Sequence, residues 1–229
     1  VKVNHIISKQ QIISTDGNTI LGADDKAGTT IMLWMIKNKI PGLYYFFIGE
    51  ECGCVGSSAA STYGSFKGKY DRVISFDRRG TNSVITFQSS SRCCSDEFAE
   101  ELAKQLNQEP NFAYKTDKGG VYTDSAEFVE LIPECTNISV GYQNEHTNKE
   151  TQDLYHLIKL ANAVIKVDWE NLPTKRNPSE KESRWNDFYD EWYSPVIESK
   201  ILNMLEDEDD FGFDDFDYGS GRTTPGWFN

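Results

Sequence analysis

The chain has 229 residues, of which 38% are hydrophobic, so it can bury the core of one domain or of one domain with an appendage. Its formal net charge of −13 argues against nucleic acid as a partner, and the sequence has no run of membrane-spanning length and no signal peptide. Its five cysteines suggest no disulfide framework, because an odd number of thiols fits a reducing compartment. We therefore expect a cytoplasmic protein with neither a membrane nor a nucleic acid as its partner.

In chain order, the apolar periodicity predicts strands over 11–14, 19–23, 43–48, 71–76, 82–88, 111–115 and 137–142, and helices over 29–40, 57–63, 95–107, 124–131 and 149–167. The turn residues Asp16-Gly17 predict a hairpin between the first two strands. The continuous apolar run over 43–48 is typical of a strand that is covered on both faces, and Ser95 is a predicted helix N-cap. Strands that alternate with helices predict an α/β fold, in which helices cover both faces of a mixed, largely parallel sheet.

The composition changes after residue 168, which divides the chain into a predicted domain over 1–168 and a tail over 169–229. The tail carries six Lys or Arg against fifteen Asp or Glu, whereas residues 1–168 carry seventeen against twenty-one, so the tail holds most of the negative charge. Residues 171–182 contain two prolines and few apolar residues, a composition typical of a linker.

Residues 184–229 are acidic but contain many aromatic side chains. Four of these share one face of a predicted helix: Trp185, Phe188, Tyr189 and Trp192. Soluble proteins rarely expose such a face, which favours docking of residues 184–229 on this domain, on a second subunit or on another protein. A disordered tail without a partner is the alternative.

Carboxylate or imidazole side chains follow four of the predicted strands: Asp24, Glu50 with Glu51, Asp77 and His146. Each has a structural explanation when taken alone, such as helix capping by Asp24 or a turn at Asp77. However, parallel strands bring their carboxyl ends to one edge of a sheet, so we expect all four positions to converge on one crevice. Clustered carboxylates repel one another, and a divalent cation relieves this repulsion. Carboxylate and imidazole ligands suit zinc, with manganese or cobalt as alternatives.

The motifs around these residues resemble those of the co-catalytic di-zinc exopeptidases, the clan that includes the peptidase T, leucyl aminopeptidase and deblocking aminopeptidase families. The resemblance rests on Leu-Gly-Ala-Asp-Asp-Lys-Ala-Gly at 21–28, Gly-Glu-Glu-Cys-Gly-Cys-Val-Gly-Ser at 49–57, Ser-Phe-Asp at 75–77 and Gly-Tyr-Gln-Asn-Glu-His-Thr at 141–147. It covers roughly residues 10–167, and the order of the motifs is more specific than any one of them.

The resemblance implies a role for each of these residues. Asp24 resembles the carboxylate that bridges two metal ions, and the peptide bond to the following Asp25 is usually cis in this clan. Glu50 resembles the general base, which takes a proton from metal-bound water, leaves the metal-bridging hydroxide that attacks, and passes the proton to the leaving amine. Glu51, Asp77 and His146 resemble metal ligands, and two zinc ions are expected in a complete site.

The chain departs from the clan at one motif. A His-x-Asp sequence, which supplies a metal ligand and an orienting carboxylate, is expected upstream of Asp24, but His5 is followed by Ile6-Ile7. Because the sequence begins at Val1 rather than Met, we expect an N-terminal part of the catalytic domain to be missing. Only 68 residues separate Asp77 from His146, which leaves no room for an inserted lid domain.

These features together predict a zinc-dependent aminopeptidase that hydrolyses N-terminal peptide bonds of peptide substrates. A related amidohydrolase or deacylase on the same scaffold is an alternative. A catalytically degenerate domain that serves as a binding or structural module is another, and the missing His-x-Asp motif favours it. The presence of Glu50 argues against that alternative, because a scaffold needs no general base beside a metal ligand.

Overall fold

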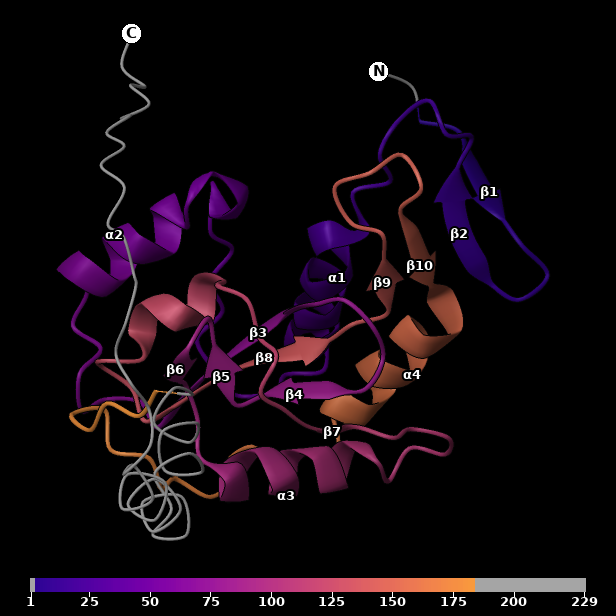
Figure 1. Cartoon of the computed structure of the whole chain (residues 1–229). Coiled ribbons are helices and arrows are strands. Elements are labelled where there is room, and N and C mark those ends of the chain that lie inside the picture. Colours follow the sequence, from indigo (N-terminus) through magenta and orange to yellow (C-terminus); the bar gives the residue numbers. More distant parts are fainter. Residues whose placement is uncertain (1–2, 184–229) are drawn as a thin grey trace, which may run out of the picture. The chain divides into compact units, whose positions relative to one another are not determined.

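The structure of the protein is a computed structural model, which describes residues 3–183 (Figure 1). Four strands of this part of the chain form a mixed sheet in the order β3-β8-β4-β7. They are β3 (Arg72–Arg78), β8 (Glu134–Ser139), β4 (Ser83–Ile85) and β7 (Lys115–Asp117). The pairs β3–β8 and β4–β7 are parallel, whereas β4 and β8 are antiparallel. The predicted mixed, largely parallel sheet of an α/β fold is therefore confirmed.

A second sheet is antiparallel throughout, in the order β1-β2-β10-β9. Its strands are β1 (His5–Ile7), β2 (Ile12–Thr15), β10 (Thr151–Asp153) and β9 (Tyr142–Gln143). The short strands β5 (Phe87–Gln88) and β6 (Ser91–Arg92) pair with each other. Since β9 and β10 pair directly, the loop between them, which contains His146, is fixed at both ends.

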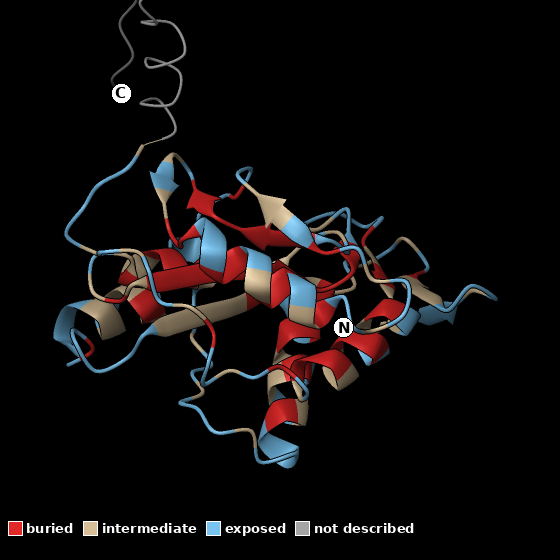
Figure 2. Ribbon diagram, turned by 90° about the horizontal axis from the view of Figure 1, so that it is seen from below, coloured by how far each residue is buried: buried red, intermediate tan, exposed pale blue. Residues whose placement is uncertain are grey.

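Helices cover both faces of the mixed sheet. They are α1 (Ala23–Lys37), α2 (Val55–Tyr63), α3 (Asp96–Leu106) and α4 (Leu154–Val164), with 3-10 turns η1 (Glu50–Cys52) and η2 (Asp124–Phe128). Apolar side chains of α1, α3 and α4 bury one core with Val84 and Ile138, while Ile85 and Cys135 point to a second core with Phe128. Figure 2 shows the buried residues in the sheet and on the sheet-facing sides of the helices. Among the described residues, no helix is long and apolar enough to cross a membrane.

Local sequence signals account for several elements. Ser95 caps α3 as predicted, because its hydroxyl oxygen accepts a hydrogen bond of 3.2 Å from the amide of Phe98. The chain between β3 and β9 forms α3, η2 and further strands, so within residues 3–183 no separate lid domain interrupts it. The predicted helix over 149–167 begins only at Leu154, because residues 151–153 pair as β10.

Two predictions about strands are wrong: a hairpin and a buried strand. Residues 12–15 pair with β1 and β10 rather than with residues 19–23, so the hairpin around Asp16-Gly17 does not form. The apolar run over 43–48 forms no strand, and Leu43 and Ile48 are 56% and 78% exposed. Among the described residues β3 is the outermost strand and pairs only with β8, so its other edge is open. Residues 41–47 do not pair with that edge, because a cleft lined by residues 41–47 and 71–77 lies there instead.

The predicted linker packs against the domain. Leu172 is buried, and the guanidinium of Arg72 donates hydrogen bonds to the carbonyl oxygens of Trp169 and Leu172. The buried carboxylate of Glu134 accepts hydrogen bonds from the amides of Lys175 and Arg176. These polar contacts come from residues far away in the sequence, so the composition of the segment did not indicate them. The proposed docking helix falls in 184–229, outside the described residues, and stays a prediction.

Candidate metal centre

The paired carboxylates Asp24 and Asp25 lie in the first turn of α1, where both residues have non-helical backbone angles. The peptide bond between them is cis, as the resemblance implied. Gly22 precedes them in the left-handed region, with φ 69°, and Gly28 lies one turn into the helix. A side chain at Gly28 would collide with the carbonyl oxygen of Phe76 in β3 and with the carboxylate of Asp25. Glycine at this position therefore allows α1 to lie directly against the end of β3, where Asp77 follows.

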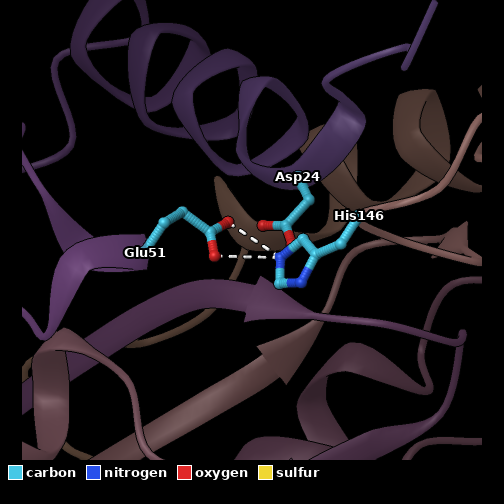
Figure 3. A group of neighbouring side chains, drawn as sticks. All are labelled: Asp24, Glu51 and His146. Atoms are coloured by element: carbon cyan, nitrogen blue, oxygen red, sulfur yellow. Dashed lines mark hydrogen bonds and ion pairs between the residues drawn. The ribbon is translucent and has the colours of Figure 1, made fainter. Parts of the chain in front are cut away.

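A first group of side chains consists of Asp24, Glu51 and His146 (Figure 3). The Nε2 atom of His146 lies 3.0 Å from Oδ2 of Asp24 and 2.9 Å from the carboxylate oxygens of Glu51. One ligand atom from each residue lies within 4.8 Å of the other two. The hydrogen bond to Glu51 is the main reason why the pKa of His146 is raised. The three side chains come from α1, η1 and the β9–β10 loop, and they could enclose a single cation.

A second group, Asp24, Asp25 and Asp77, consists of carboxylates alone, with one oxygen from each again within 4.8 Å of the others. Asp77 is oriented by two hydroxyl donors: Oγ1 of Thr123 at 2.6 Å and the hydroxyl of Tyr142 at 3.1 Å. Because Asp24 belongs to both groups, it stands between two places where a cation could bind.

The electrostatics of these carboxylates follow from burial and mutual repulsion. Burial, followed by the charge of Asp77, raises the pKa of Asp24 to about 8 and that of Asp25 to about 9. Burial also raises the pKa of Asp77. Without a cation, the group therefore holds protons at neutral pH that ordinary aspartates have released.

Glu50 belongs to neither group. It is the first residue of η1, and burial together with the charge of Asp77 raises its pKa to about 7. The thiol of Cys54 lies 3.9 Å from its carboxylate. Glu50 and Glu51 are thus adjacent in sequence but differ in surroundings, because only Glu51 reaches His146.

The structure brings Asp24, Glu51, Asp77 and His146 together around Asp24, although only Asp77 lies on a strand. Sequence reasoning did not assign a place in the cluster to Asp25. It also missed Thr123 and Tyr142, which donate hydrogen bonds to Asp77, and Glu150, whose carboxylate accepts a hydrogen bond from the amide of Asp24. Tyr142 lies within a quoted motif, and Glu150 follows His146 by four residues, so proximity in sequence was the available signal.

A cleft of about 760 Å³ opens beside the cluster. Its lining includes Asp24, Asp25, Glu50, Glu51 and Asp77, and also aromatic side chains of residues 44–47 and 66–70. Such a combination of convergent polar groups and apolar walls is typical of sites for small ligands and peptides.

The chain matches no protein-family model and no curated protein. Solved structures do match. Aminopeptidase PepT from Bacillus cereus has a TM-score of 0.57 at 15% identity over 72% of this chain and 75% of that chain. A tripeptidase from Staphylococcus aureus has a TM-score of 0.56 at 15% identity, with the same coverage of both chains. The chain shares the fold of these peptidases.

Pyrococcus horikoshii TET1 peptidase, which can assemble into a tetrahedron or a large octahedral shell, has a TM-score of 0.55 at 18% identity. The match covers 72% of this chain but 52% of TET1, so the chain corresponds to about half of that protein. At these identities the comparisons establish the fold, and the activity has to be argued from the side chains.

The burial of Asp24 and its repulsion by Asp77 predict that Asp24→Asn stabilises the metal-free protein at high pH. Because these effects raise the pKa of Asp24 from 3.8 to about 8 in the folded state, the contribution of Asp24 to stability is greatest below pH 4 and is lost as the pH rises through 8. We expect the Tm of the variant to exceed that of the wild type by about 2–4 °C at pH 8, corresponding to about 1 kcal/mol, and the difference to vanish near pH 4.

Scanning calorimetry in the presence of a chelator measures this difference. Asp71→Asn is the matched control, because it removes the same charge from a carboxylate whose side chain is 72% exposed. Equal effects of the two variants at pH 8 would contradict the role of burial and repulsion at Asp24.

Proposed function

We propose that the protein is a metal-dependent exopeptidase of the aminopeptidase type, with Glu50 as general base. The observation that carries this proposal is the double cluster centred on Asp24, with the raised pKa of Glu50 beside it. The fold, which the chain shares with solved peptidases, also supports the proposal. A protein with this fold but an unrelated function would not need such a cluster.

The donor set fits a divalent cation. Asp24, Glu51 and His146 would hold one ion, and Asp77 with the shared Asp24 would contribute to a second, with zinc as the best match and manganese or cobalt as alternatives. A bound cation would supply Lewis-acid polarisation of the scissile carbonyl. It would also neutralise the carboxylates whose burial and mutual repulsion raise their pKa values.

Glu50 is suited to move a proton. A general base works best when its pKa lies near the working pH, and burial beside Asp77 raises the pKa of Glu50 to about 7. Its carboxylate would accept a proton from the attacking water and return it to the leaving amine. The neighbouring Glu51 is turned toward His146 by hydrogen bonds of 2.9 Å, which separates the two roles.

The charge of the cleft suits a cationic group of the substrate. Asp124 lines the cleft beside the cluster and lies outside the proposed set of ligands, so a bound cation would leave its carboxylate available to the substrate. A free α-amino group near this carboxylate would be stabilised by it, whereas an acylated amine would carry no charge to recognise. This distinguishes an aminopeptidase from a deacylase on the same scaffold.

If Glu50 transfers the proton and Glu51 binds the metal, Glu50→Gln should lower kcat by about 10²–10⁴-fold without lowering the metal content. Elemental analysis of the purified variant, alongside peptide hydrolysis, measures both quantities. Glu51→Gln is the matched control and should lose metal as well as activity. If Glu50→Gln loses metal and Glu51→Gln keeps it, the two assignments are reversed.

The charge of the cleft predicts that hydrolysis requires a free N-terminal amine. A tripeptide amide and its N-acetylated form, compared by mass spectrometry, provide the test, and we expect at least a tenfold preference in kcat/KM for the free amine. Preferential hydrolysis of the acetyl group would indicate a deacylase. Cleavage of neither peptide by metal-loaded protein would favour the non-catalytic alternative.

A further inference from the structure

Glu150 is a buried carboxylate that lies outside both groups of candidate ligands. Only 2% of the residue is exposed, and both of its carboxylate oxygens accept hydrogen bonds from backbone amides at the start of α1. Oε2 accepts from the amide of Gly22 at 2.6 Å, and Oε1 accepts from the amide of Asp24 at 2.9 Å. The carboxylate thus binds the backbone on which the Asp24 side chain is carried.

These amides need a partner because they precede the regular part of α1. Asp24 and Asp25 have non-helical φ and ψ angles, and the regular helix after them is capped by Asp25, whose Oδ1 accepts a hydrogen bond of 2.9 Å from the amide of Gly28. A backbone amide buried without a partner is costly, and a carboxylate that accepts from it makes a charge-assisted hydrogen bond. Glu150 supplies the acceptor for Gly22 from a position 128 residues away in the sequence.

The same residue is close in sequence to His146. Glu150 ends the β9–β10 loop and is followed at once by β10, whose pairing with β2 and β9 fixes its position. The amide of Glu150 also donates a hydrogen bond of 3.2 Å to the carbonyl oxygen of Thr147, so the backbone between His146 and Glu150 is closed into a turn. One side chain therefore ties the segment that carries His146 to the segment that carries Asp24.

We propose that Glu150 is a positioning residue that sets Oδ2 of Asp24 against Nε2 of His146, a separation of 3.0 Å. The proposal rests on the proposed function to the extent that these two side chains bind a metal together. Glu150 would act only through the backbone of Asp24, since its own oxygens are both used by amides. Its loss should loosen the metal site without changing the set of ligands.

Glu150→Gln is the direct test in the full chain. The amide side chain keeps one acceptor, but its –NH2 group faces a backbone N–H, so one of the two hydrogen bonds is lost. We expect the Kd for zinc, measured by competition with a chromophoric chelator, to rise by about 10–100-fold, as is typical when a residue that orients a ligand is removed. If the Gln variant does not fold, Glu150→Asp replaces it in the same measurement. This variant keeps the charge, but its side chain is shorter by one methylene, so its carboxylate no longer reaches both amides.

Glu134→Gln is the matched control. Glu134 is also fully buried and also binds backbone amides with both oxygens, those of Ser95 at 2.7 Å and Lys175 at 2.6 Å. It lies at the amino end of β8, opposite Arg72 at the start of β3, whereas Asp77 lies near the other end of β3. We expect Glu134→Gln to lower the Tm about as much as Glu150→Gln does but to leave the Kd for zinc unchanged. This difference separates an effect on ligand position from an effect on stability.

A crystal structure of metal-free Glu150→Gln tests the positioning without reference to metal. The proposal predicts that Asp24 and His146 move beyond hydrogen-bond reach, about 3.5 Å, while the surroundings of Glu134 stay unchanged. An unchanged separation of 3.0 Å would overturn the proposal, as would a zinc Kd equal to that of the wild type. If the wild type itself binds no zinc, the proposed function fails, and the crystal structure alone decides the role of Glu150.

Discussion

Mutual repulsion of carboxylates around Asp24 is the constraint on which the rest of the site depends. Three aspartates place oxygens within 4.8 Å of one another, and Glu51 approaches the same residue from the other side through His146. In ordinary proteins such a group would be dispersed, since each charge disfavours the next and burial disfavours all of them. The proposed cation would neutralise the group and so account for its persistence in a buried setting. In a metal-binding protein, the repulsion and burial of such carboxylates destabilise the metal-free fold, and binding of the ion relieves this destabilisation.

The surrounding elements keep these charges together by close backbone approach and by hydrogen bonds. Gly28 lets α1 lie against β3, which brings Asp25 and Asp77 together. Hydroxyl donors from Thr123 and Tyr142 fix Asp77, and the buried Glu150 holds the backbone of Asp24. The candidate ligands come from a helix start, a 3-10 turn, a strand and a loop, so the geometry of the site depends on contacts between elements.

Local signals in the sequence predicted much of this arrangement. Ser95 caps α3 through its own hydroxyl, and the motif around Asp24 identified the place where the charges meet, although α1 begins at Ala23 and not at the predicted residue 29. Features that depend on distant partners were not predictable. The run over 43–48 has the composition of a central strand, but composition does not show whether a run pairs, and this one does not join the open edge of β3. Residues 171–182 have the composition of a linker, but Arg72 and Glu134 bind their backbone. Nothing local marks Glu150 as buried, since an isolated glutamate is usually exposed.

The central claim is that the cluster around Asp24 binds a divalent cation, and diffraction at the zinc absorption edge tests it most directly. Crystals of the full chain grown with zinc should give an anomalous peak at ligand distance, about 2.0–2.2 Å, from Asp24, Glu51 and Nε2 of His146. A second, weaker peak beside Asp77 is expected, because the carboxylate group there lacks an imidazole. Anomalous peaks confined to other parts of the molecule, with His146 still hydrogen-bonded to Glu51, would contradict the account.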